Sequence, residues 1–207
     1  MLPGLMAGGD QGLAIRATSL KELRFLTTVR QQYDYSCGSA ALATLLTYQY
    51  RDPVSEETAF KAMWDRGDKE KIRQEGFSLL DIKEYLEASG YAANGYVAPL
   101  EKLVEVGVPA IALINEKGYN HFVVIKGVKD DSVLLGDPSV GSRILSRADF
   151  GKMWVNGILF VITGKKDRAV FNARSEWQIL PKSPLQLAVH HDGMARIGFL
   201  RPGVLSF

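Results

Sequence analysis

Residues 30–46, RQQYDYSCGSAALATLL, contain the one cysteine of the chain, Cys37, between a polar, aromatic run and a run of small and branched apolar residues. The second run is dense enough in alanine and leucine to predict a buried helix that begins near the cysteine. A thiol in the first turn of a helix lies at the positive end of the macrodipole, so we expect its pKa to be lowered. The stretch indicates either a nucleophile at a helix start or a small residue packed in a core, which is the commoner role of a lone cysteine.

The composition is that of an ordinary globular protein, with 207 residues, 46% of them hydrophobic and 23% charged, and a net charge of +2. The sequence has no block of like charges that would indicate nucleic-acid binding. No apolar run approaches the roughly 20 residues of a transmembrane helix. A single cysteine allows no internal disulfide, so it does not identify the redox compartment. Residues 1–18 lack the features of a signal peptide and are expected to be a flexible segment.

The periodicity of the sequence changes halfway along the chain. Helices are predicted at residues 36–50, 52–67, 76–90 and 98–107, with Ser55 and Ser78 as N-caps and glycines as stops. Short β-branched runs then predict strands at 108–115, 119–128, 132–138 and 157–164, with one short helix at 146–154. We therefore expect an α+β domain over 19–165, with an N-terminal helical half packed on an antiparallel sheet, and an extension over 166–207 that packs on it.

A nucleophilic cysteine needs a base, and three histidines are available: His121, His190 and His191. The last two are adjacent in the irregular tail, where an exposed position is expected. His121 begins a predicted strand whose alternation places it on one face with Val123 and Ile125. If that face packs on the Cys37 helix, the imidazole meets the thiol; the alternative is a structural histidine.

Two further groups complete an acyl-transfer site. Asp137 ends the strand that follows His121 and could accept the Nδ1–H of its imidazole, although a simple turn aspartate is the alternative. Gln31 lies six residues before Cys37 and could hold the oxyanion through its side-chain amide. Gln32 is an equal candidate by spacing alone.

Three residues are candidates for contacts with a substrate. Gly38 leaves room beside the sulfur for a substrate carbonyl, and its backbone N–H could help to hold the oxyanion. Tyr119 and Asn120 directly precede His121 and are expected to rim the cleft. Nothing in the sequence indicates a metal or another cofactor.

Four segments, QQYDYSCGSAALATLL, GVPAIALIN, NHFVVIKGV and LLGDPSVG, together resemble the signature blocks of papain-like, bacteriocin-processing cysteine peptidases, which act at double-glycine leaders. The resemblance covers about residues 25–165 and implies a papain-like fold with Cys37 as nucleophile, His121 as base and Asp137 as its orienting partner. It also implies Gln31, rather than Gln32, as oxyanion donor, and small residues such as glycine before the cleaved bond.

Many members of this family are fused to ABC transporters, but this sequence has no G-x-x-x-x-G-K-[ST] motif and resembles the stand-alone branch. The segment RQQYDYSCGSAALATLL is similar to that of proteobacterial members of the family that serve functional-amyloid secretion. The resemblance implies a periplasmic location (the alternative is cytoplasmic) and a secreted peptide or protein as substrate, with an outer-membrane exporter or amyloid subunit as partner. Two alternative functions remain: a docking module that binds a secretion substrate without cutting it, and a transamidase that uses the same triad.

Overall fold

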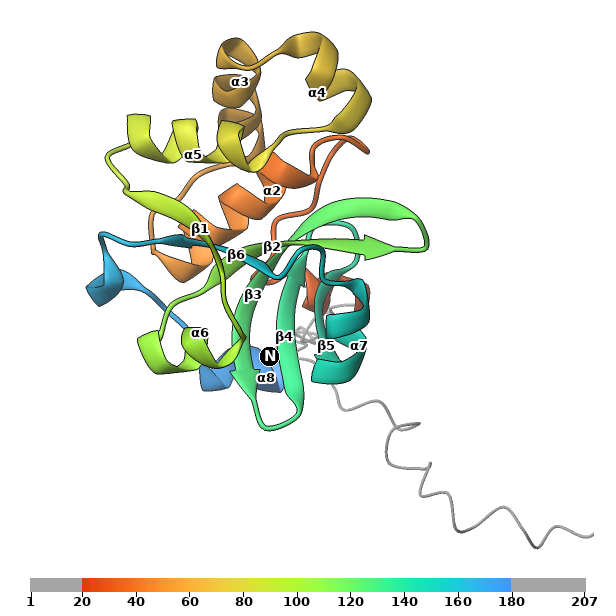
Figure 1. The fold of residues 1–207 in the computed structure, drawn as a ribbon, viewed down its shortest axis with the longest axis vertical. Coiled ribbons are helices and arrows are strands. Elements are labelled where there is room, and N and C mark those ends of the chain that lie inside the picture. The colour runs from red at the N-terminus through yellow and green to blue at the C-terminus, as the bar shows by residue number, and fades with distance from the viewer. Residues whose placement is uncertain (1–19, 180–207) are drawn as a thin grey trace, which may run out of the picture.

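Helices precede strands in the computed structural model, which describes residues 20–179 (Figure 1). The helical elements of the first half are α1 (Leu20–Arg24), α2 (Cys37–Thr44), a π-helical turn (Leu45–Gln49), α3 (Glu56–Arg66), α4 (Lys69–Glu75) and α5 (Leu79–Ala88). The strands are β1 (Ala93–Val97), β2 (Ala110–Glu116), β3 (Tyr119–Lys129), β4 (Ser132–Asp137), β5 (Gly141–Ser146) and β6 (Ile158–Ile162). The remaining helices are α6 (Glu101–Val106), α7 (Arg147–Met153), a 3-10 turn (Lys166–Arg168) and α8 (Arg174–Ile179).

The strands form one antiparallel sheet in the order β1-β6-β2-β3-β4-β5. Strands β2 to β5 follow one another as hairpins, and β6 returns to lie between β2 and β1. The predicted α+β arrangement of helices on an antiparallel sheet is confirmed. The prediction missed β1 and β5, because glycine, asparagine and serine dilute the apolar alternation in both segments.

The predicted helix starts are confirmed by their caps. The Ser55 side chain accepts a hydrogen bond from the Thr58 backbone at the start of α3. Ser78 forms a capping box with Asp81 at the start of α5, and the Ser146 side chain caps α7. Each cap satisfies a backbone N–H that has no partner inside its helix, which typically stabilises a helix by about 1 kcal/mol.

The sheet separates two hydrophobic clusters. One surrounds α2, all of whose residues are buried, and includes side chains of α3, α5 and the sheet; Figure 1 shows α2 to α5 gathered on one side of the strands. The other lies under α6 and α7. Phe122 and Val124 of β3 belong to the first cluster, whereas Val123 and Ile125 belong to the second.

This division corrects one expectation about β3. His121 does alternate with Val123 and Ile125, but the face of β3 that packs around α2 carries Phe122 and Val124. The condition that the Val123–Ile125 face of β3 packs on the Cys37 helix is therefore not met. Strand alternation identifies which residues share a face, but it does not show which face meets a given helix, because both faces of this strand are apolar.

The first part of the C-terminal extension contacts the domain. The backbone N–H of Val170 donates to Gln49 O, and the Asn172 side chain bonds both backbone groups of Val128. Residues 1–19 and 180–207, which include the predicted flexible segment, most of the extension, His190 and His191, lie outside the described residues. No helix between residues 20 and 179 is long and apolar enough to cross a membrane.

Candidate active site

Cys37 is the first residue of α2, as the sequence predicted, and its side chain is buried with 6% of its surface exposed. Burial raises the pKa of the thiol, and the charge of Asp137 raises it further, while backbone hydrogen bonds from Phe122 and Gly38 oppose the change. The expectation of a lowered thiol pKa is therefore wrong in direction, because removal from water outweighs the helix start. A thiol with a raised pKa is protonated at neutral pH, so its attack requires a base.

His121 and Asp137 form a buried pair in which Nε2 of the imidazole lies 3.1 Å from Oδ2 of the carboxylate. The prediction that these residues interact is confirmed. The prediction that Nδ1 is the ring nitrogen that contacts Asp137 is wrong, because Nε2 makes the contact. Nδ1 is buried and has no hydrogen-bond partner among the described residues. With Nε2–H donating to the carboxylate, Nδ1 of a neutral imidazole carries the lone pair and can accept a proton.

Strand β3 brings this imidazole to the start of α2. The ring of Phe122, the residue after His121, lies 3.5 Å from where a Cβ on Gly38 would be, and the Phe122 backbone lowers the pKa of the Cys37 thiol. Tyr119 stacks on the His121 ring at 5.8 Å between centroids. Burial raises the pKa of Tyr119, and the charges of Cys37 and Asp34 raise it further. The nucleophile candidate and the base candidate thus belong to the same small region, although their side chains come from opposite halves of the chain.

The Asp137 carboxylate is held by three groups. Oδ2 also pairs with Arg143 at 2.8 Å, and Oδ1 accepts the Ser139 backbone N–H at 2.9 Å. Burial alone would raise the pKa of Asp137, but the hydrogen bond and charge of His121, together with Arg143 and Ser139, lower it overall. The carboxylate therefore stays ionised at neutral pH and can fix the orientation of the imidazole.

Arg143 contacts Asp137 but was not predicted from the sequence as part of the site. It lies on the unpredicted strand β5, and its guanidinium also pairs with Glu116 of β2 at 2.9 Å. The hydrogen bond from Arg143 is the largest cause that lowers the pKa of Glu116. Recognition of GSRILS as a strand beside β4 would have placed this arginine near Asp137.

Glu116, His121 and Asp137 place donor atoms within 4.8 Å of one another, a spacing that could hold a metal ion. The Arg143 guanidinium already pairs with both carboxylates. A second cation would be repelled by this charge, so the cluster is better described as a hydrogen-bonded support for the imidazole.

The structure distinguishes the two glutamines. Gln31 is half-buried, and its Oε1 accepts a hydrogen bond from Ser139 Oγ at 3.0 Å, two residues after Asp137. Its Nε2 donates to Tyr33 O, which leaves a second amide hydrogen for another acceptor. Gln32 is exposed. Position therefore favours Gln31 as the oxyanion donor, as the resemblance implied.

The three predicted contact residues have different surroundings. A Cβ on Gly38 would lie 2.8 Å from Cβ of Phe77, so packing within the core requires this glycine, and the expected open space is filled. Tyr119 lines the cleft, as predicted, and its hydroxyl donates to Asp34 O. Asn120 is not at the cleft: its side chain accepts a hydrogen bond from Asn115 across the β2–β3 hairpin.

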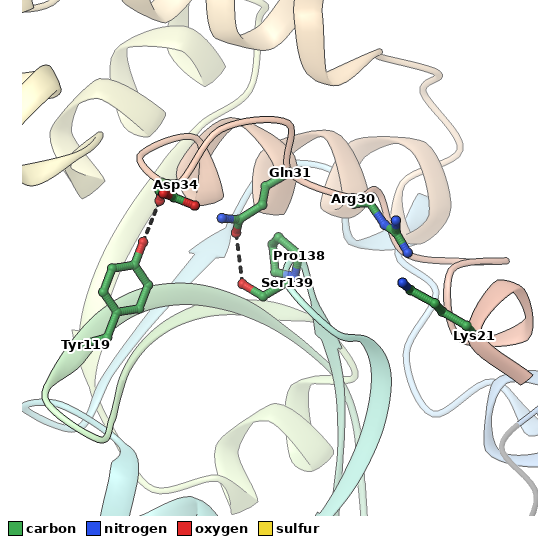
Figure 2. Close-up of a pocket in the computed structure, with 7 residues that line it drawn as sticks. All are labelled: Lys21, Arg30, Gln31, Asp34, Tyr119, Pro138 and Ser139. Carbon is green, nitrogen blue, oxygen red and sulfur yellow. Dashed lines mark hydrogen bonds between the residues drawn. The ribbon is translucent and has the colours of Figure 1, made fainter.

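An open cleft of about 460 Å³ lies beside this site (Figure 2). Tyr119 and Asp34 line one end, and Gln31 lies in the middle, beside Pro138 and Ser139. Arg30 and Lys21 line the other end. The cleft therefore borders Tyr119, two residues before His121, and also Pro138 and Ser139, which directly follow Asp137.

Comparisons with known proteins identify relatives of this chain. Two curated relatives are named "probable functional amyloid protease FapD". The one from Pseudomonas fluorescens is 43% identical over 72% of this chain and 66% of its own length. The one from Pseudomonas aeruginosa is 40% identical over 79% of this chain and 71% of its own length. The matches thus span about two thirds of the length of these relatives.

Two solved structures share the fold. The peptidase domain of Streptococcus ComA, a bifunctional ABC transporter of a quorum-sensing pathway, matches with a TM-score of 0.56 and 21% identity, over 66% of this chain and 97% of that domain. A double glycine motif protease from an AMS/PCAT transporter, solved in complex with the leader peptide, matches with a TM-score of 0.54 and 29% identity. The match covers 66% of this chain and 91% of that protein. The model of the peptidase C39 family matches residues 26–166, which contain Cys37, His121 and Asp137. The chain belongs to the peptidase C39 family.

Proposed function

We propose that the protein is a cysteine endopeptidase that cleaves a secreted peptide or protein after small residues such as glycine. The observation that carries the proposal is the buried His121–Asp137 pair, which leaves Nδ1 of the imidazole without a partner among the described residues. The next residue along β3, Phe122, has its ring beside Gly38, which follows Cys37 in α2. A base that is oriented by a carboxylate and adjoins a thiol is the arrangement required for nucleophilic catalysis.

The reaction proceeds by acyl transfer. Nδ1 of His121 takes the thiol proton as the Cys37 sulfur attacks the peptide carbonyl carbon, and the carbonyl oxygen becomes an oxyanion. The Gln31 amide and a backbone N–H at the helix start stabilise that oxyanion. The imidazolium then gives its proton to the leaving nitrogen, the C–N bond breaks, and a thioester remains on Cys37. A water molecule, deprotonated by the same imidazole, hydrolyses the thioester and restores the thiol.

Crowding near the sulfur supports the preference for small residues. The Cys37 side chain is 6% exposed, and Phe77 and Phe122 fill the space beside Gly38. A residue with a large side chain would have to displace these rings before its carbonyl carbon could reach the sulfur. The double glycine motif protease with its leader peptide is a relative with the same fold and supports this specificity.

The names of the relatives support a proposal for the biological setting. We infer that the substrate belongs to a functional-amyloid or related export system, because the two Pseudomonas relatives are named as functional amyloid proteases. A periplasmic location, with an outer-membrane exporter or an amyloid subunit as partner, is part of the same proposal. Fractionation of cells that express the complete gene, with periplasmic and cytoplasmic marker enzymes as controls, tests the location.

The proposal is tested by incubating wild-type protein and Cys37→Ala with peptides of about 20 residues that carry a central Gly-Gly pair. The wild type is expected to produce two fragments, the first ending in glycine, and the variant none. An added amine nucleophile separates hydrolysis from transamidation, because a transamidase would attach the amine to the first fragment. Identical fragment patterns from wild type and Cys37→Ala would end the proposal and leave a docking role.

A further inference from the structure

The cleft beside the site is electrically polarised along its length. Arg30 and Lys21 line one end, and the other end contains the carboxylate of Asp34 (Figure 2). The Arg30 guanidinium lies 4.2 Å from the centroid of the Phe25 ring, a contact that holds the side chain in place without neutralising its charge. Among residues 20–179, neither Arg30 nor Lys21 forms an ion pair with a carboxylate, so both charges are available to a ligand.

The end that contains Asp34 is the one nearer to the nucleophile. Asp34 stands three residues before Cys37, and Tyr119, whose hydroxyl hydrogen-bonds to Asp34 O, stacks on the His121 ring. Figure 2 shows Gln31 between this end and the two cations. A peptide that runs along the cleft from the reacting carbonyl therefore passes Gln31 before it reaches Arg30 and Lys21.

The cleft lies on the leaving-group side of the scissile bond. The leaving nitrogen must come within hydrogen-bond distance of the His121 imidazole, which protonates it. The wall of the cleft consists of Pro138 and Ser139, which directly follow Asp137, and of Tyr119, which stacks on His121. The segment released as the new amino terminus thus occupies the cleft.

We propose that this cleft selects substrates with an acidic residue in the segment that follows the cleaved bond, and that Arg30 and Lys21 bind its carboxylate. The inference rests on the proposed peptidase function and deepens it by naming the substrate class. The polarity of the cleft fits the product as well, since the new ammonium group forms near Asp34 while the acidic side chain lies at the two cations. Both cations are exposed, so each pair is worth about a two- to fivefold change in kcat/KM and weakens with salt.

The test uses a peptide library with a fixed Gly-Gly pair followed by three randomised positions, and identifies the released fragments by mass spectrometry. Wild-type protein is expected to enrich aspartate and glutamate at one of the three positions. Peptides that carry Asp or Asn at that position are then compared at about 50 mM and 500 mM salt, where the screening length differs severalfold. The expected ratio of their kcat/KM values is roughly three- to tenfold at low salt and approaches one at high salt.

Charge-reversal variants test whether Arg30 and Lys21 cause the preference for an acidic residue. Arg30→Glu and Lys21→Glu, singly and together, are expected to lower the Asp/Asn ratio and, in the double variant, to make a Lys peptide the better substrate. Lys61→Glu, an exposed residue of α3 outside the cleft, makes the same change in net charge and should keep the wild-type ratio. Each ratio is measured within one variant, so a general loss of activity does not affect it.

The outcomes separate this inference from the function on which it rests. No cleavage of any library member by the wild type would overturn the proposed function and this inference with it. Cleavage without enrichment of acidic residues would overturn the inference alone. An Asp/Asn ratio of kcat/KM values that stays at the wild-type level in the double variant would also overturn the inference alone.

Discussion

Nε2 of His121, not Nδ1, points at Asp137, and the buried Nδ1 is left without a partner among the described residues. One ring nitrogen is thus used for orientation, and the other remains available for proton transfer. The same pair ties β3 to β4, so the orientation of the base depends on the register of the sheet and on the groups that hold Asp137.

Asp137→Asn is expected to lower kcat/KM by at least about 100-fold while the protein remains folded. The amide can donate a hydrogen bond to Nε2, which stabilises the tautomer with its proton on Nδ1, the atom that must accept the thiol proton. Steady-state kinetics on a Gly-Gly peptide measure the effect, and Asp65→Asn, at an exposed position on α3, is the matched control. Equal rates for the two variants would contradict the role given to Asp137.

The stability contributed by Asp137 should depend on pH. Its pKa in the folded protein is lower than in the unfolded chain, so the unfolded state binds more protons between the two values. The contribution is therefore complete above the unfolded value of about 3.9 and is lost as pH falls through the lowered folded value. Urea denaturation should show wild type more stable than Asp137→Asn by about 3 kcal/mol at pH 7, with the gap closing in strong acid. A gap that does not change with pH would refute this account.

Arg143 acts on the reaction through Asp137, and its removal should change the pH profile as well as the rate. Loss of the guanidinium raises the pKa of Asp137, because Arg143 is one of the groups that lower it. Arg143→Gln is expected to lower kcat with little change in KM and to move the acid limb of the pH–rate profile to higher pH. Arg143→Lys restores the charge and should recover part of the shift. A purely structural role would lower the amount of active protein without moving the profile.

Alkylation of Cys37 tests the direction of its pKa. Because burial raises the pKa of the thiol, the free enzyme should react with iodoacetamide more slowly than a small free thiol at pH 7. As pH increases, the alkylation rate of Cys37 should still be rising at pH values where the rate of the free thiol has reached its plateau. A fast rate that is constant from pH 6 to 8 would instead indicate a preformed thiolate–imidazolium pair.

The C-terminal extension supplies a counter-charge to the interior. Lys126 of β3 is 0% exposed, and its Nζ lies 2.9 Å from Glu176 of α8. Burial lowers the pKa of Lys126, and the charge of Glu176 opposes that change. Glu176→Gln leaves the cation buried without its partner and should lower the free energy of unfolding by about 3–5 kcal/mol. Denaturant titration measures this loss.

Two comparison variants make the test of Glu176 specific. Addition of Lys126→Met to Glu176→Gln removes the unpaired charge and should restore much of the lost stability. Glu87→Gln breaks an exposed pair with Lys83 and should cost less than about 1 kcal/mol. A loss for Glu176→Gln as small as that for Glu87→Gln would show that the buried pair does not support the domain.

The local features of the fold could be predicted because they depend on near neighbours in the sequence. The caps at Ser55, Ser78 and Ser146 follow from side chains within three residues of one another, and the helix that begins at Cys37 follows from its apolar density. The partnership of His121 with Asp137 was also predictable, because consecutive antiparallel strands lie side by side.

The features that were missed depend on the packing of distant segments. The face of β3 that meets α2 and the ring nitrogen that meets Asp137 are decided only when sheet and helices come together. Arg143 pairs with Asp137 from the neighbouring strand β5, which was not predicted because its composition is polar. The raised pKa of Cys37 follows from burial among side chains of both halves, which outweighs the local effect of the helix start.

The most direct test of the central claim is the capture of the acyl-enzyme. Wild-type protein is mixed with a Gly-Gly peptide, quenched in acid within milliseconds to seconds, digested and analysed by mass spectrometry. The account predicts that the peptide containing Cys37 gains the mass of the amino-terminal substrate fragment as a thioester, and that the Cys37→Ala protein shows neither adduct nor cleavage. Cleavage by the Cys37→Ala protein at the wild-type rate would contradict it.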